Sequence, residues 1–303
     1  MARPMLPVLV LAVAVVSSVV SIVNPVEAQA PTKTAIVTTP DGVRISAQEW
    51  GNPQGAEILF IHGFSQSHLS WNRQVRSELA RDFRMVTYDI RGHGVSDKPM
   101  TPEYYKEGKR WADEVQAVID QMGLRKPVLV GWSYGGRIVN DYLLTHGTGR
   151  IAGIDFVAAT SKADPSLFGP GLRFLKPMAE ADLAANIDAT KQFLKACFAK
   201  QPSAEDYDTM LAFNMMVPPV VRGHMGGRPV PYEAMLRSLN VPFLVTHGTE
   251  DQLVLIGMGR LTASMVPGAK LSVYEGVEHA PFWEDAPRFN RELAEFVRAA
   301  NGR

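Results

Sequence analysis

The sequence predicts an α/β protein in which helices cover both faces of a mainly parallel sheet. Six short apolar runs are mostly separated by stretches of helical character, and such alternation is typical of a parallel sheet. Two further β-rich runs, 33–39 and 43–50, flank Asp41-Gly42, which predicts a hairpin with a tight turn. The six apolar runs are 57–61, 84–88, 127–130, 151–158, 242–246 and 270–274.

The composition limits the size of the fold and the kind of partner. With 303 residues, 46% of them hydrophobic, the chain can form one large core that carries an insertion. The formal net charge is zero, so no overall field attracts nucleic acid or an anionic membrane, and we expect a small, largely apolar partner. The single cysteine, Cys197, excludes an intramolecular disulfide and a cysteine-based metal cluster.

The first thirty residues predict a targeting segment. Arg3 precedes an apolar run from Leu6 to Val23, and Ala28-Gln29-Ala30 provides the small residues that signal peptidase recognises. We therefore expect residues 1–30 to be a cleaved signal peptide and the protein to be periplasmic or secreted. The run is nearly long enough to span a bilayer, so a retained N-terminal anchor is the alternative, and only then would the protein contact a membrane.

A helix is predicted between the apolar runs at 84–88 and 127–130. Thr101 can cap it, Pro102 suits its first position and Gly123 ends it. Between these ends, apolar residues recur at helical spacing and predict a stripe that packs on the sheet. They are Trp111, Val115, Val118, Ile119 and Met122.

The core is interrupted by a long insertion. Residues 162–238 lack a clear strand, and this is too long for an ordinary crossover, so we expect a helical lid between core segments 31–161 and 239–303. Ser203 and Asp206 form a capping pattern at the start of one of its helices. The aromatic and methionine side chains of the insertion form its own small core or line a substrate pocket. Of these, Phe213 and Met215 are predicted pocket residues.

The motif Gly131-Trp132-Ser133-Tyr134-Gly135 carries the main indication of chemistry. This G-x-S-x-G sequence follows a predicted strand and precedes a helical stretch. Such a sharp turn requires neighbours without side chains, and it leaves the Ser133 hydroxyl above the sheet. We expect Ser133 to be the nucleophile and Trp132 to line the pocket. The backbone N–H groups of Phe64 and Tyr134 are the expected oxyanion hole.

A serine nucleophile needs a base, and the base needs a carboxylate that orients it. His279 lies in a loop after the last predicted strand, whereas His62, His93 and His247 have positions typical of structural residues. Asp251 follows the strand at 242–246, which gives the chain order serine, acid, histidine. Asp164 also follows a predicted strand and is the alternative acid.

Together these residues resemble the α/β-hydrolase fold family, in the branch of esterases, carbon–carbon bond hydrolases and cofactor-free haloperoxidases. The resemblance implies an eight-stranded sheet with one antiparallel strand and a helical lid after strand six. Haloalkane dehalogenases and epoxide hydrolases have aspartate where this chain has Ser133, which argues against both. The matching segments are His62-Gly63-Phe64, Trp71, Asp89 to Asp97, Gly131 to Gly136, Gly248 to Leu253 and Gly276 to Glu284.

The predicted function is hydrolysis of small to medium carboxylic esters through an acyl-enzyme on Ser133. The same triad serves two alternatives, perhydrolysis in the manner of haloperoxidases and carbon–carbon bond hydrolysis. A third alternative, of a different class, is a non-catalytic ligand-binding protein on the same fold. Because the triad supplies its own nucleophile, we expect neither a metal nor an organic cofactor.

Overall fold

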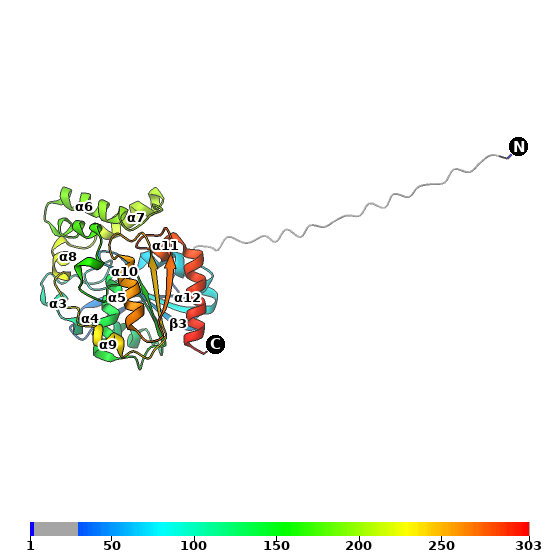
Figure 1. Ribbon diagram of the computed structural model, residues 1–303, viewed down its shortest axis with the longest axis horizontal. Coiled ribbons are helices and arrows are strands. Elements are labelled where there is room, and N and C mark those ends of the chain that lie inside the picture. Colours follow the sequence, from blue (N-terminus) through cyan, green and yellow to red (C-terminus); the bar gives the residue numbers. More distant parts are fainter. Residues whose placement is uncertain (3–29, 303) are drawn as a thin grey trace.

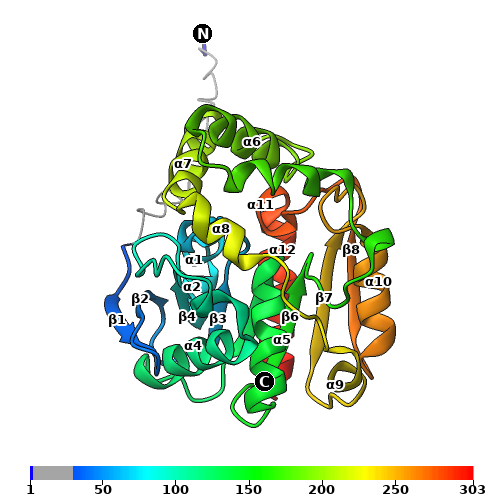
Figure 2. The ribbon, with the colours of Figure 1, turned by 90° about the vertical axis from the view of Figure 1, so that its left-hand side faces the viewer.

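The computed structural model describes residues 1–2 and 30–302, so the predicted signal peptide or anchor lies almost wholly outside the described residues. Eight strands form one sheet with the order β1-β2-β4-β3-β5-β6-β7-β8, and most of them are labelled in Figure 2. They are β1 (Lys33–Thr38), β2 (Arg44–Gly51), β3 (Ala56–Ile61), β4 (Phe83–Tyr88), β5 (Val128–Trp132), β6 (Gly153–Val157), β7 (Phe243–Gly248) and β8 (Lys270–Tyr274).

Twelve α-helices and four short 3₁₀ helices occur in the described part of the chain. The α-helices are α1 (Asn72–Val75), α2 (Leu79–Asp82), α3 (Glu103–Lys106), α4 (Gly108–Gln121), α5 (Tyr134–His146), α6 (Leu183–Lys195), α7 (Ala204–Met215), α8 (Pro219–Met225), α9 (Glu233–Arg237), α10 (Ile256–Met265), α11 (Pro281–Glu284) and α12 (Ala286–Ala300). The 3₁₀ helices are η1 (His68–Trp71), η2 (Pro165–Leu167), η3 (Pro170–Phe174) and η4 (Pro177–Ala179). No described helix has the length and apolar character needed to cross a membrane.

The sheet is parallel except at β2, which runs antiparallel to both β1 and β4. This confirms the predicted eight-stranded, mainly parallel sheet with one antiparallel strand. The register aligns the carboxyl ends of the central strands: Ile61 at the end of β3 pairs with Tyr88 and with Gly131. The loops that leave these strands therefore meet at one edge of the sheet, where ligands bind in open α/β folds.

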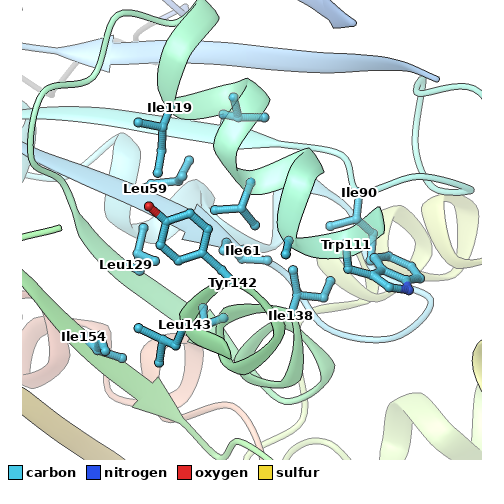
Figure 3. Close-up of a cluster of buried hydrophobic side chains, with 14 of the residues drawn as sticks. Leu59, Ile61, Ile90, Trp111, Ile119, Leu129, Ile138, Tyr142, Leu143 and Ile154 are labelled. Atoms are coloured by element: carbon cyan, nitrogen blue, oxygen red, sulfur yellow. The ribbon is translucent and has the colours of Figure 1, made fainter. Parts of the chain in front are cut away.

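Two apolar layers cover the faces of the sheet, and β3 contributes to both. Leu59 and Ile61 are buried in one layer with residues of α4 and α5, whereas Ile58 and Phe60 are buried in the other with residues of α12. This follows from the twofold alternation of side chains along a strand that is buried on both sides. Figure 3 shows part of the first layer, with Leu59 and Ile61 beside Tyr142.

The helix predicted from residue 101 is interrupted in the structure. Glu107 has an extended backbone (φ −88°, ψ 123°), which separates the short helix α3 from α4. Gly108, the first residue of α4, packs closely on α5, since a Cβ there would lie 2.6 Å from an Asp141 carboxylate oxygen. The predicted apolar stripe of α4 is confirmed, because the stripe is buried from its first residue, Trp111, onward.

The segment between β6 and β7 contains η2–η4 and helices α6–α9. Figures 1 and 2 show α6, α7 and α8 gathered at one end of the sheet. The predicted cap of α7 is present, because the Ser203 hydroxyl accepts a hydrogen bond from the Asp206 N–H at 3.1 Å. Phe193 of α6 meets Phe64 of the core edge-on, with ring centroids 6.2 Å apart. This contact places the insertion above the β3 loop.

Candidate active site

Ser133 occupies a strained turn between β5 and α5. Its backbone has φ 54° and ψ −115°, a region that residues other than glycine rarely adopt. The neighbouring glycines make the turn sterically feasible. A Cβ at Gly131 would lie 2.8 Å from the Gly136 Cα, and one at Gly135 would lie 2.2 Å from the Ile61 carbonyl oxygen. The structure thus accounts for the glycines of the motif by close backbone approach.

The structure brings Asp251 and His279 together. His279 Nδ1 lies 2.7 Å from Asp251 Oδ2, and both residues are only 2% exposed. The Trp132 indole N–H donates to the His279 carbonyl oxygen at 2.8 Å, which fixes the histidine loop beside the serine turn. No hydrogen bond between Ser133 and His279 is present among the described residues. In enzymes without substrate, such contacts are often long and tighten when substrate binds.

Asp251 is held as a carboxylate. Its Oδ1 atom accepts the backbone N–H groups of Leu253 at 2.8 Å and Val254 at 2.9 Å. Burial raises the pKa of Asp251, but the facing imidazoles of His279 and His247 and their hydrogen bonds outweigh burial and hold this pKa below its usual range. An ionised Asp251 favours the His279 tautomer with a proton on Nδ1, so that Nε2 is free to accept a proton.

His247 is a site residue that sequence reasoning missed. We expected a packing residue, but its Nε2 lies 3.1 Å from Asp251 Oδ2 and 2.7 Å from the Val254 carbonyl oxygen. Because a carbonyl only accepts, Nε2 must carry the proton, and it is shared with the carboxylate. The i, i+4 spacing of His247 and Asp251 across a strand end is the signal that would have found it.

Asp164, the alternative acid, lies elsewhere. Its carboxylate accepts the Ser166 backbone N–H at 3.0 Å and the Ser166 hydroxyl at 2.7 Å, and so caps η2. The side chain is partly exposed, and these hydrogen bonds lower its pKa. Asp164 therefore has a local structural role, and Asp251 is the carboxylate that faces His279.

The two predicted oxyanion donors border Ser133. A Cβ at Gly63 would lie 3.2 Å from the Ser133 Cβ, so the loop that carries Phe64 passes directly beside the serine. Tyr134 is the first residue of α5, where helical N–H groups have no intrahelical acceptor. Within residues 30–302, neither the Phe64 nor the Tyr134 N–H donates to a protein acceptor. Both donors are thus available to an oxyanion.

Two buried histidines hold the oxyanion loop. His62 Nε2 accepts the Ile90 N–H at 3.1 Å, while its Nδ1 donates to the Gly63 carbonyl oxygen at 2.9 Å. His93 Nε2 accepts the Ser65 N–H at 3.0 Å. Burial lowers the pKa of His62 to about 4, and burial also lowers the pKa of His93. The hydrogen bonds of both rings to the backbone of these loops confirm the structural roles predicted for them.

A cavity of about 410 Å³ lies between Ser133 and the insertion. Its wall is mostly apolar, with backbone and side chains from both the core and the helical segment. A larger hollow of about 820 Å³, between α2 and α12, touches none of the site residues. The lining of the cavity at Ser133 includes Phe64, Phe168, Leu172, Leu175, Phe193, Met225, Leu253 and Val254.

The structure corrects the predicted pocket residues, because none of the three lines the cavity. Trp132 packs beneath the site, where its ring lies 4.8 Å from Phe282 and its N–H is used by His279. Phe213 is 4% exposed and belongs to the buried apolar layer. Met215 lies at the end of α7 and does not reach the cavity. Composition identified an apolar insertion, but tertiary packing decides which of its faces meets the cavity.

Comparison with known families agrees with this geometry. A family model described as alpha/beta hydrolase fold matches residues 57–286, a range that contains Ser133, Asp251 and His279. The chain belongs to the α/β-hydrolase fold family. The family expected from the sequence motifs is therefore confirmed, and the protein is a hydrolase of this fold.

Relatives of this hydrolase include proteins named as chloroperoxidases and proteins named as esterases. A non-heme chloroperoxidase from Kitasatospora aureofaciens is 30% identical over 86% of this chain and 98% of its own, and a bifunctional esterase/perhydrolase from Acinetobacter calcoaceticus is 28% identical over 87% and 99%. Among solved structures, a candidate aryl esterase from Burkholderia cenocepacia is 36% identical, with a TM-score of 0.86 over 89% of this chain and all of its own. An esterase from Rhodococcus sp. ECU1013 is 32% identical, with a TM-score of 0.83 over 88% and 99%.

Residues 1–2 and 30–302 contain no group of three or more His, Cys, Asp or Glu side chains placed to hold a metal ion. The buried Cys197 thiol donates to the Phe193 carbonyl oxygen at 3.3 Å, and burial raises its pKa well above the usual range. This thiol is a packing group just beyond the end of α6.

Proposed function

We propose that this hydrolase cleaves small to medium carboxylic esters through an acyl-enzyme on Ser133. The observation that carries the proposal is the strained Ser133 turn at the mouth of an apolar cavity, with the Asp251–His279 pair beside it. His279 takes the Ser133 proton as the hydroxyl oxygen attacks the ester carbonyl carbon. The ester C–O bond then breaks, and the alcohol leaves with the proton from His279.

The oxyanion that forms during attack needs donors that are already in place. The Phe64 and Tyr134 N–H groups border Ser133 and have no protein acceptor in the described chain. Donors fixed before the reaction need no reorganisation, and one such donor typically contributes a factor of about 10² to 10³ in kcat. In the second half of the cycle, water attacks the acyl-enzyme with His279 as base, and the carboxylic acid and free Ser133 result.

Perhydrolysis is a second candidate, favoured by the names of the relatives. One is called a chloroperoxidase and another an esterase/perhydrolase. In this route, hydrogen peroxide replaces water as the group that attacks the acyl-enzyme. His279 accepts the peroxide proton as the peroxide oxygen attacks the acyl carbon, the Ser133–acyl bond breaks, and His279 returns the proton to the Ser133 oxygen as the peracid is released. The route needs no redox group, because the peroxide O–O bond remains intact in the product.

One panel tests both candidates. Purified protein is assayed with p-nitrophenyl acetate, butyrate and octanoate, with and without hydrogen peroxide. We expect hydrolysis of the shorter esters, and peracid formation when peroxide is present would add the second activity. A folded protein that turns over no ester and forms no peracid would contradict the proposal and favour a ligand-binding role.

A further inference from the structure

Arg222 of α8 is a buried cation without a carboxylate partner. It is only 2% exposed, and no Asp or Glu oxygen of the described chain lies within ion-pair distance of it. Its N–H groups donate to neutral acceptors, and Nε has no partner at all. The acceptors are the Met178 carbonyl at 3.0 Å, the Asn186 side-chain oxygen at 2.7 Å, the Thr190 hydroxyl at 3.3 Å and the Asn214 carbonyl.

The other buried arginines differ in this respect. Arg91 pairs with Glu114 at 2.7 Å, and Arg228 pairs with Asp141. Burying an ionised group is costly unless an opposite charge compensates it. The neutral acceptors around Arg222 satisfy part of its hydrogen bonding but leave its charge uncompensated within the described protein.

Arg222 lines the same cavity as Ser133. Two further cations, Arg137 and Lys176, line this cavity, and none of its lining residues is Asp or Glu. A chain of zero net charge has therefore placed three positive side chains, and no negative one, around its candidate site. Burial lowers the pKa of Arg222 to about 10, so the group remains charged at neutral pH.

We propose that Arg222 binds an anionic group of the substrate, and that the preferred esters carry a carboxylate, as the half-esters of dicarboxylic acids do. This inference rests on the proposed ester hydrolysis at Ser133. Arg222 would then act as a specificity residue: guanidinium–carboxylate pairs are strong and directional, and substrate would supply the missing counter-charge. The apolar wall holds the methylene chain between the two ends of the substrate.

Matched substrates isolate the charge. Monomethyl glutarate and monomethyl adipate are each compared with the methyl ester of the corresponding monoamide, and 3-acetoxypropanoate is compared with its amide. Methanol or alcohol release is measured for all of them. We expect kcat/KM at least about tenfold higher for the carboxylate in one series, which is the contribution of a charge-assisted hydrogen bond. The acyl-side and alcohol-side series show which part of the ester meets Arg222.

Variants assign the effect to Arg222. Arg222→Gln should lower the carboxylate-to-amide ratio about tenfold, whereas Arg222→Lys should retain part of it. Lys176→Gln is the matched control, because this exposed cation on the same cavity is screened by solvent and should change the ratio less than about threefold. An unchanged ratio in folded Arg222→Gln would overturn the assignment and reduce Arg222 to a clamp within the insertion.

The native enzyme provides a test that does not depend on how the variants fold. Glutarate should inhibit hydrolysis of neutral methyl butyrate competitively, with a Ki at least about tenfold lower than that of glutaramide. Wild-type enzyme that hydrolyses methyl butyrate but shows no preference for any carboxylate substrate or inhibitor would overturn this inference alone. Failure to hydrolyse any of the esters would instead contradict the proposed function.

Discussion

The loops at the strand ends and the helical insertion both border the cavity, but their sequences constrain them differently. At the strand ends, glycines meet backbone atoms so closely that another residue would clash, as Gly135 at the start of α5 does with the Ile61 carbonyl. In the insertion, many apolar side chains are interchangeable in character, and only packing decides whether a residue such as Phe213 or Phe193 faces the cavity. Short sequence motifs thus determine where the catalytic groups lie, whereas tertiary packing determines which side chains of the insertion contact the substrate.

The first prediction tests whether the strand-end loops carry the chemistry, by removing the candidate nucleophile. Ser133→Ala should lower kcat for p-nitrophenyl butyrate by about 10⁵ to 10⁶, the effect of removing the serine in other triads. Folding is compared by the melting temperature, which should not fall, because alanine has the same Cβ. A folded variant that retains more than about a tenth of wild-type kcat would place the chemistry elsewhere.

The second prediction separates the two candidate acids. Asp251→Asn should lower kcat by about 10³ to 10⁴ with a modest change in KM, because the His279 tautomer is then no longer favoured. Asp164→Asn is the matched control and should change kcat less than about tenfold, since Asp164 only caps η2. Steady-state kinetics on both variants distinguish the two acids. A large loss of kcat in Asp164→Asn, with little change in Asp251→Asn, would assign the acid to the loop after the earlier strand.

The extent to which sequence predicted this molecule follows from the same contrast. Short-range rules predict the strands, the mainly parallel sheet and the positions of Ser133, Asp251 and His279. In each case a run of apolar residues ends at a glycine-containing loop. The break at Glu107 was missed because Thr101 and Pro102 indicate where a helix begins, and this signal does not distinguish one helix from two. His247 was missed because its ring reaches Asp251 only once the strand end is folded.

The third prediction tests whether the residues of the insertion that line the cavity set the preferred acyl chain length. Leu175 lines the cavity, so Leu175→Ala should enlarge it and raise the octanoate-to-butyrate ratio of kcat/KM by about tenfold, as hydrophobic pockets discriminate by methylene groups. Met215→Ala is the control, since Met215 does not line the cavity, and should leave the ratio unchanged. Equal shifts in both variants would show that the insertion acts as a whole and that the lining does not set chain-length preference.

The last prediction on variants concerns the stability of the oxyanion loop in acid. The pKa of folded His62 is about 4, below the ordinary value of 6.5, so the native state requires the neutral ring. Its contribution to the free energy of unfolding is complete above pH 6.5 and is lost as pH falls toward 4, by about 1.4 kcal/mol per pH unit. Melting temperatures across this range should fall less steeply for His62→Asn than for wild type. Identical slopes would assign the acid sensitivity to other groups.

The most direct test of the central claim, that the strand-end loops make Ser133 a nucleophile, is covalent labelling. A fluorophosphonate ester should react with one serine of the native enzyme, and peptide mass spectrometry should locate the adduct on Ser133. Asp251→Asn should react far more slowly, and Ser133→Ala should not be labelled. A stoichiometric adduct on another residue, or none on a folded enzyme that hydrolyses esters, would contradict the account.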